Sequence, residues 1–446
     1  MRFPHDSQKP REIQAAVQCY HQPLPISAPN VNAALKSAAR LLSLKDVWLL
    51  SGGHCFTHWY PATFFILLPI LGKELGLSYT EIGFIMTVQH LAGAMTNMPG
   101  GMLVDAVGKK GYLMAISLFW VGVPYALMAL THNYWMLLAC VALVGIGNNL
   151  WHPSAIPTLA NRYPERKGFI LALHGMGGNL GEAIAPLFIG LLLTYMSWRA
   201  AVIVNIIPGA VMAVMILLML GAFAVSYNTG GTHAPAESKT PGEYLRGTLG
   251  LLRNRGLMLI SISSGFRIMT QIGLLTFLPA YLAFELGYSP WAVGLAMTLL
   301  QIAGFIATPI GGYLSDRMGR KKVVMASFGM TAILIVAMAL AGRTPAFIFM
   351  VAILGFFLYA TRAVIQAWTI EETPKHLAAT GIGLVFTLQG IGAAISPTIF
   401  GLIADAYDIF TAFYFLAGTV IVANCLIVFM PNREAGHSTA PATATR

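Results

Sequence analysis

Long apolar runs separated by short polar stretches dominate this chain. Each run holds roughly 20 residues or more, the length that a helix needs to cross ~30 Å of hydrocarbon. The pattern predicts an all-α integral membrane protein with twelve membrane-spanning helices. They lie near residues 46–71, 79–101, 112–130, 134–160, 168–195, 200–224, 256–284, 290–312, 323–341, 346–370, 379–404 and 410–430.

The twelve predicted helices form two sets of six that repeat one another. One short motif occurs twice, 211 residues apart: as GGMLVDAVGKK from Gly100 to Lys110, and as GGYLSDRMGRK from Gly311 to Lys321. A period this long indicates a duplicated domain, because solenoid repeats recur every ~20 to 50 residues. The same offset pairs Gly83 with Gly294, Pro186 with Pro397 and Gly190 with Gly401.

The repeat and the polar stretches divide the chain into five parts. We expect two homologous six-helix bundles, joined by a linker rich in Gly and Pro and flanked by polar ends. The parts are a cytoplasmic extension (1–44), the first bundle (45–225), a cytoplasmic linker (226–255), the second bundle (256–430) and a disordered tail (431–446).

Charge is scarce and unevenly placed. Charged residues make up 10% of the chain and hydrophobic residues 57%, whereas a soluble domain carries about 25% charged residues. Of 27 Lys and Arg, only Lys73, Arg199 and Arg343 fall in loops on one side, and Arg267 and Arg362 fall within spans. The other 22 lie in the termini and the loops of the opposite side. Because positive charge stays cytoplasmic during insertion, we expect a multi-pass cell-membrane protein, at the inner membrane if bacterial, with both termini cytoplasmic. The net charge of +10 is then a topology signal, and we expect no nucleic-acid partner.

The polar ends and the cysteines indicate neither a signal peptide nor a metal or disulfide site. The first 44 residues lack the apolar core and cleavage site of a signal peptide, although 32–44 could form a short amphipathic helix on the membrane. Four cysteines make neither a CxxC pair nor a disulfide framework. We expect a monomer without a cofactor, whose partners are the lipid bilayer, a small-molecule substrate and protons.

The repeated motif suits a turn at the cytoplasmic end of the second helix of each half. Its paired glycines allow two helices to approach closely, and its Asp can accept N–H groups at a neighbouring helix N-terminus. The trailing basic residues can pair with the Asp or with anionic headgroups. The alternative is that the motif only shapes the turn. We assign conformational gating to Gly100, Gly101, Asp105, Gly108, Lys109, Gly311, Gly312, Asp316, Gly319 and Arg320.

With two such motifs in register, the chain resembles the major facilitator superfamily of secondary transporters across its membrane-embedded length. The resemblance implies two six-helix bundles around a central cavity, which rock to expose the cavity alternately to each side. It also implies that Asp105 and its basic neighbours belong to a cytoplasmic latch that breaks as the halves rock.

Three segments resemble, more narrowly, the fosmidomycin-resistance family of efflux transporters. They read GHCFTH at 53–58, VGIGNNLWHP at 144–153 and GGNLG at 177–181. The chain departs from that family at His58 and Ser154, where the family carries acidic residues. It also has Ala185-Pro186 where antiporters have Gly-Pro.

Eight titratable side chains fall inside the predicted spans, where such groups are costly and are functional candidates by default. Counting 1.5 Å per residue from the span ends puts His58, His90, Glu182 and Arg267 near the midplane. His54 and His58 are four residues apart, hence on one helix face. The eight are His54, His58, His90, His152, His174, Glu182, Arg267 and Arg362.

The two intramembrane arginines indicate the substrate class. A guanidinium presents a planar fork suited to a carboxylate, phosphate or phosphonate, so we interpret Arg267 and Arg362 as a clamp for an anion or zwitterion. The alternative is that each pairs with Glu182 or with helix carbonyls and holds helices together. The predicted substrate-binding residues are Arg267, Arg362, His58, His54, His152, Trp151 and Gln301.

Proton coupling needs a group that changes ionisation during the cycle. With the acids of the efflux family absent, Glu182 is the one carboxylate near the midplane, and it could load and release a proton as its surroundings alternate between a dry, Arg-paired site and water. His58 is the rival, because histidine titrates near neutral pH.

These residues favour a proton-coupled secondary transporter that exports a small organic anion, zwitterion or drug-like compound. Import of an organic anion by proton symport is the alternative. The chain contains no phosphate-binding GxxxxGK[ST] loop, so the sequence does not indicate an ATP-driven pump. A membrane enzyme would need a nucleophile–base pair or a metal cluster, for which His54, His58 and His90 form the one conceivable nest; we expect no metal site. A non-transporting receptor on the same fold is the third class.

Overall fold

The computed structural model describes residues 44–107, 109–148, 150–220, 250–341, 344, 346–374 and 377–430. The expected N-terminal extension, most of the linker, the C-terminal tail and Arg343 fall outside the described residues. Eleven helices within these ranges are long and apolar enough to cross a membrane.

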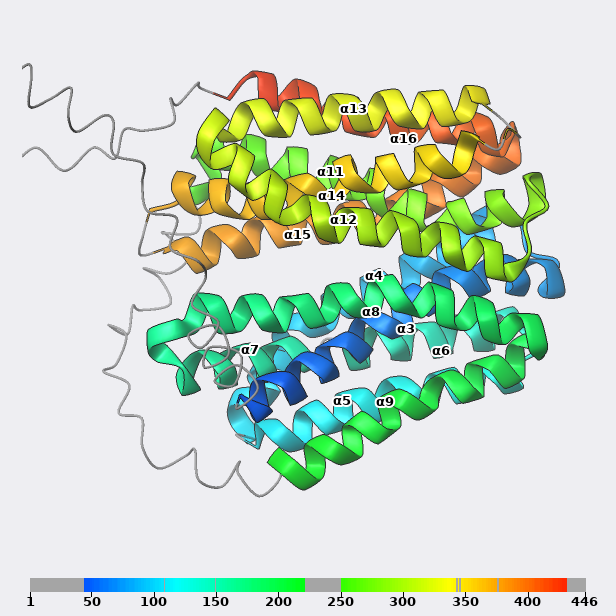
Figure 1. Ribbon diagram of the computed structural model, residues 1–446, viewed down its shortest axis with the longest axis horizontal. Coiled ribbons are helices and arrows are strands. Elements are labelled where there is room, and N and C mark those ends of the chain that lie inside the picture. The colour runs from blue at the N-terminus through cyan, green and yellow to red at the C-terminus, as the bar shows by residue number, and fades with distance from the viewer. Residues whose placement is uncertain are drawn as a thin grey trace, which may run out of the picture. The chain divides into compact units, whose positions relative to one another are not determined.

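The helices follow the twelve predicted spans in order, coloured from blue to red in Figure 1. The fourth span is broken into two helices before Pro153, which lies in the first turn of the second helix, where a missing N–H is tolerated. The first half contains α3 (Lys45–Leu75), α4 (Tyr79–Val107), α5 (Lys110–Leu130), α6 (Tyr134–Asn148), α7 (Trp151–Arg162), α8 (Lys167–Tyr195) and α9 (Trp198–Leu220). The second half contains α11 (Arg255–Ala280), its π-helical continuation η3 (Tyr281–Glu285), α12 (Pro290–Met318), α13 (Arg320–Ala341), α14 (Ala346–Glu372), α15 (Ala378–Ala406) and α16 (Ile409–Val428).

The turn after the first span is built in the same way in both halves. Gly76 and Gly287 adopt φ of 63° and 67°, a left-handed conformation in which glycine is favoured. Two residues later, Ser78 Oγ accepts the N–H of Glu81 while the Glu81 carboxylate accepts the N–H of Ser78, which is a capping box. Ser289 caps α12 from the equivalent position. The duplicated sequence therefore specifies a duplicated helix start.

The halves meet near this end of the helices, which carries the loops at 75–79, 195–198, 285–290 and 406–409 and which we call the outer end. There α4 packs on α15, and α8 packs on α12. A Cβ added to Gly83 would overlap the carbonyl oxygen of Pro397, and one added to Gly294 would overlap that of Pro186. The second symmetric set is Gly190 against the Pro290 carbonyl and Gly401 against the Tyr79 carbonyl.

Asp405 adds a polar link between the same helices. Its carboxylate accepts the backbone N–H groups of Tyr79 and Thr80 at 2.9 and 2.8 Å and the Thr80 hydroxyl at 2.6 Å. A carboxylate is favourable at a helix N-terminus, where N–H groups lack intrahelical partners. The end of α15 thus caps the start of α4 in the other half. We call this contact, together with the four glycine contacts, the outer closure.

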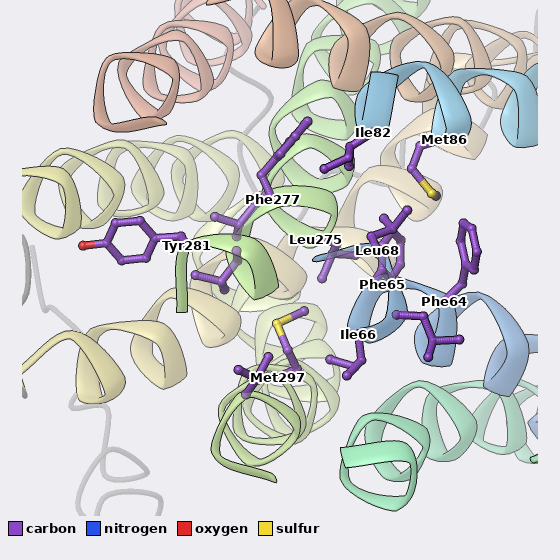
Figure 2. Packing of buried hydrophobic residues seen from close by; sticks show 14 of the residues in the cluster. Phe64, Phe65, Ile66, Leu68, Ile82, Met86, Leu275, Phe277, Tyr281 and Met297 are labelled. Carbon is purple, nitrogen blue, oxygen red and sulfur yellow. The ribbon is translucent and has the colours of Figure 1, made fainter. Parts of the chain in front are cut away.

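The core beside the outer closure is shared by the first spans of the two halves, as Figure 2 shows. Phe64 and Phe65 of α3 belong to the same buried cluster as Leu275 and Phe277 of α11. Met297 of α12 completes it from a third helix. The polar side chains of the same spans lie further along, toward the middle of the helices.

Candidate functional site

A cavity of about 140 Å³ lies between the halves, with one wall from α8 of the first half and the rest from α11, α14 and α15 of the second. Its charged groups are two guanidiniums and one carboxylate. Its lining residues are Glu182, Arg267, Ile268, Gln271, Arg362, Ile365, Gln366, Phe386 and Gln389.

Glu182 connects the two halves across this cavity. Its Oε1 accepts the Nδ1–H of His58 on α3 at 2.7 Å, and its Oε2 lies 3.9 Å from Nη1 of Arg362 on α14. The side chains of His58 and Glu182 are each 22% exposed, and that of Arg362 is 42% exposed. Glu182 thus pairs closely with a histidine of its own half and more loosely with an arginine of the other.

Arg267 is held differently from Arg362. It is 4% exposed and donates to Oε1 of Gln271, one turn further along α11, at 2.8 Å. Its Nε has no hydrogen-bond partner among the described residues. Arg362 donates to Asn179 on α8 at a long 3.5 Å. Since buried charged groups need partners, the buried Arg267 retains a donor that a bound anion could satisfy. Among the described residues, the more exposed Arg362 is held only by long contacts to Asn179 and Glu182, which leaves it able to contact the same anion.

Three histidines gather next to Glu182 on the side of the first half. Nε2 of His54 on α3 lies 3.1 Å from Nε2 of His152 on α7, and Nδ1 of His54 donates to the carbonyl of His174 at 2.7 Å. The rings of His54 and His58 meet edge to face at 4.7 Å. The ring of His174 stacks on that of His54 at 4.2 Å and so packs against the cluster.

Of the predicted substrate-binding residues, Arg267 and Arg362 line the cavity, whereas His54, His58, His152, Trp151 and Gln301 do not. Trp151 is fully buried and packs against Gly53, where an added Cβ would overlap its ring, so it is a packing residue rather than a wall. Gln301 is 8% exposed and is not among the lining residues. His90 on α4 does not join the histidine cluster, whose third member is His152. Although counting along the spans put His90 at the same depth as His58, the two side chains do not meet in one cluster.

Four amides near the arginines were not predicted. Gln271 and Gln366 stand four residues after Arg267 and Arg362, on the same helix face, and line the cavity with Gln389. Asn179 approaches Arg362 from α8. The Arg-x₃-Gln spacing, present twice, is the sequence signal that could have found the first two.

The repeated motif is seen best in its second copy. Asp316 pairs with Arg320 at 2.5 Å, and Arg320 reaches Glu371 at the end of α14 at 2.9 Å. An added Cβ at Gly311 would overlap the Ala360 carbonyl, whereas Gly312 has open space. Only the first glycine of this pair therefore serves close helix approach. Gly319 ends α12 at φ 93°.

In the first copy of the motif, Gly100 is buried within α4 and Lys109 precedes α5. Gly108, the surroundings of Gly101 and the side chain of Asp105 fall outside what the structure describes.

Comparison with known proteins identifies the family of this chain. The family model of the Major Facilitator Superfamily matches residues 50–290 and 260–445. This chain belongs to the Major Facilitator Superfamily. It is 25% identical to the hexuronate transporter of Bacillus subtilis (strain 168) over 81% of this chain and 88% of that protein. It is 23% identical to the fosmidomycin resistance protein of Escherichia coli (strain K12) over 93% and 98% of the two chains.

The solved structures agree on the fold. The nucleoside transporter NupG superposes with a TM-score of 0.73 at 14% identity, covering 86% of this chain and 99% of that one. The resemblance inferred from the repeated motif is confirmed, as are the all-helical membrane fold and the two related halves. The chain is a multi-pass secondary transporter of the superfamily, which acts on small molecules within the membrane.

Proposed function

We propose that this transporter carries a small organic anion, which binds at Arg267 and Arg362, and that it couples this movement to a proton bound at Glu182. The observation that carries the proposal is the position of Glu182. It lines the same cavity as both arginines and lies 3.9 Å from one of them. The anion class is also supported by similarity to a hexuronate transporter, whose named substrate is a sugar acid.

The coupling follows from competition for Arg362. An ionised Glu182 neutralises part of the guanidinium's charge, whereas a protonated Glu182 does not attract it. Protonation therefore frees Arg362 for the anion, and anion binding in turn favours protonation, because linkage is reciprocal. Proton and anion then occupy the cavity together, which supports symport and hence uptake driven by an inward proton gradient.

Export remains the second candidate, and the observation that favours it is the similarity to the fosmidomycin resistance protein. Exchange of a proton for the substrate would require the two to exclude each other from the cavity. The two functions therefore predict opposite effects of pH on substrate affinity.

The remaining features complete the proposal. We place the protein in a bacterial inner membrane with both termini cytoplasmic, acting as a monomer. The outer closure holds the two halves in contact in this structure, and we propose that in this state the cavity exchanges with the cytoplasmic side. Asp105 and Asp316, with their neighbours Lys109 and Arg320, then act as the gating residues that the superfamily resemblance implies.

A thermal-shift screen of the purified protein tests the substrate class. The panel contains sugar acids, phosphorylated three-carbon acids, fosmidomycin and the matching neutral sugars, because a ligand that binds the folded state raises apparent stability. We expect stabilisation by anions in the wild type and little in an Arg267→Lys/Arg362→Lys variant. Arg199→Lys, which alters the outer-end pair with Glu74, is the control. Equal responses to anions and neutral sugars, or a double variant that responds like the wild type, would refute the clamp.

A further inference from the structure

The histidine cluster beside the cavity has donor nitrogens that converge. His54, His58 and His152 each offer a ring nitrogen, and these atoms lie within 4.8 Å of one another. Two of the rings come from one face of α3 and the third from the start of α7. The cluster is therefore held between two helices of a single half.

The hydrogen bonds made by Nδ1 of His54 and of His58 determine which ring nitrogen carries the lone pair. A carbonyl oxygen can only accept, so Nδ1 of His54, 2.7 Å from the His174 carbonyl, carries the proton. Nδ1 of His58 likewise donates to the Glu182 carboxylate. In a neutral imidazole the other nitrogen then carries the lone pair, so Nε2 of both rings can serve as a metal ligand. Without a metal, Nε2 of His54 accepts a hydrogen bond from Nε2 of His152, which a bound ion would replace.

This arrangement is the one found around protein-bound zinc. Metal-binding histidines usually donate their second ring N–H to a carboxylate or a backbone carbonyl, which fixes the tautomer and the ring orientation. Here His58 has the carboxylate and His54 the carbonyl. Histidines that were close together only by chance would not need such hydrogen-bond partners, yet two of the three rings have one.

The spacing fits after a small adjustment. Zn–N bonds of about 2.0–2.1 Å in tetrahedral geometry place ligand nitrogens roughly 3.3 Å apart. Nε2 of His54 and Nε2 of His152 are already 3.1 Å apart. All the ligand atoms lie within 4.8 Å of one another, so no pair needs to close by more than about 1.5 Å, and the partly exposed His58 side chain can adjust.

The surroundings compensate the charge of an ion. Glu182 contacts His58 and lies between it and Arg362, so its negative charge stands between a bound cation and the nearest guanidinium. The exposure of His58 and Glu182 provides a path for the ion from the cavity.

We propose that His54, His58 and His152 bind one divalent transition-metal ion of the zinc class, with Glu182 and the His174 carbonyl orienting the ligands. Imidazole nitrogen suits zinc, copper and nickel, whereas magnesium and calcium prefer oxygen. The sequence alone led us to expect no metal here, because no partnering carboxylate had a known position and because a lone histidine in a membrane is usually a hydrogen-bonded structural group. It also suggested His90, not His152, as the third histidine. The proposal does not depend on the transported substrate.

Metal binding to the purified full-length protein tests the site. Protein stripped with a chelator is titrated with Zn²⁺ by equilibrium dialysis, and with Co²⁺ by the visible absorption of four-coordinate Co²⁺. We expect the wild type to bind one ion more than His152→Gln, and Glu182→Gln to bind it roughly 10- to 100-fold more weakly. His152→Cys, which keeps a zinc ligand, should restore binding, and His90→Gln should behave like the wild type. Histidines elsewhere in the chain are the same in every variant and cancel.

Two results from the substitutions to Gln would overturn the proposal. One is equal metal binding by the wild type and His152→Gln, with both proteins eluting as single species. The other is a loss in His90→Gln as large as that in His152→Gln. Because His152→Cys retains a ligand, loss of binding in a folded His152→Cys protein would also count against the site.

Discussion

Substitution of Gly401 should open the outer closure without touching the cavity. A Cβ at this position would overlap the Tyr79 carbonyl oxygen, so α15 and α4 must separate by roughly an ångström, at a cost of about 1–3 kcal/mol in a packed contact. If the other conformation of the cycle lacks this contact, the cost falls only on the closed state. Every ~1.4 kcal/mol changes the ratio of the two states tenfold, so Gly401→Ala should shift it by roughly 5- to 150-fold toward outer-open.

The shift can be measured as a distance. Tyr195 and Tyr407, at the outer ends of the two halves, have side chains that are 77% and 76% exposed and can be replaced by spin-labelled cysteines after the four native cysteines are removed. We expect a short-distance population in the wild type and a longer one in Gly401→Ala. Gly390→Ala is the matched control on the same helix, because an added Cβ there meets open space. An unchanged distance in Gly401→Ala, or an equal change in Gly390→Ala, would refute this account of the closure.

Five further substitutions test other parts of the account. Glu182→Gln should abolish gradient-driven transport but keep substrate exchange, measured in proteoliposomes; uphill, pH-dependent transport by this variant would instead assign the proton to another group such as His58. Lys in place of Arg267 or Arg362 should reduce anion affinity, because a point charge cannot reproduce the bidentate fork; wild-type affinity in both would favour a purely structural role. Asp105→Asn should slow transport while changing ligand affinity by less than about threefold, since a latch biases two states without contacting ligand; a collapse in affinity would contradict this. Asp405→Asn should open the outer closure as Gly401→Ala does, and an unchanged spin-label distance would show that the cap is dispensable.

The fold was predictable because the same pattern of six spans occurs twice in the sequence. Twelve apolar runs set the number and length of the helices, and the 211-residue offset relates the halves. The same offset later reappears as physical contacts, with Gly83 against Pro397 mirrored by Gly294 against Pro186. Hydrophobicity and repetition therefore predicted the architecture. The contact surface between the halves was not predicted, although its glycines and prolines are among the positions that the repeat pairs.

The site was predictable only in part. Depth along a span follows from counting residues, and the residues counted to a similar depth include Glu182 and Arg267, which line one cavity, and His58, which contacts Glu182. The direction in which a side chain points around a helix does not follow, because spans that are apolar on all sides have no clear polar face. Trp151 and Gln301 were therefore included although they lie away from the cavity, and the amides that line it were missed.

The central claim is that proton and anion bind together at Glu182 and Arg362. Calorimetric titration of the purified protein with the most stabilising anion of the screen, in two buffers of different ionisation enthalpy, measures the protons exchanged on binding. The account predicts proton uptake, approaching one per anion where Glu182 is otherwise ionised, and none in Glu182→Gln. Proton release on binding, or the same uptake in Glu182→Gln as in the wild type, would contradict it.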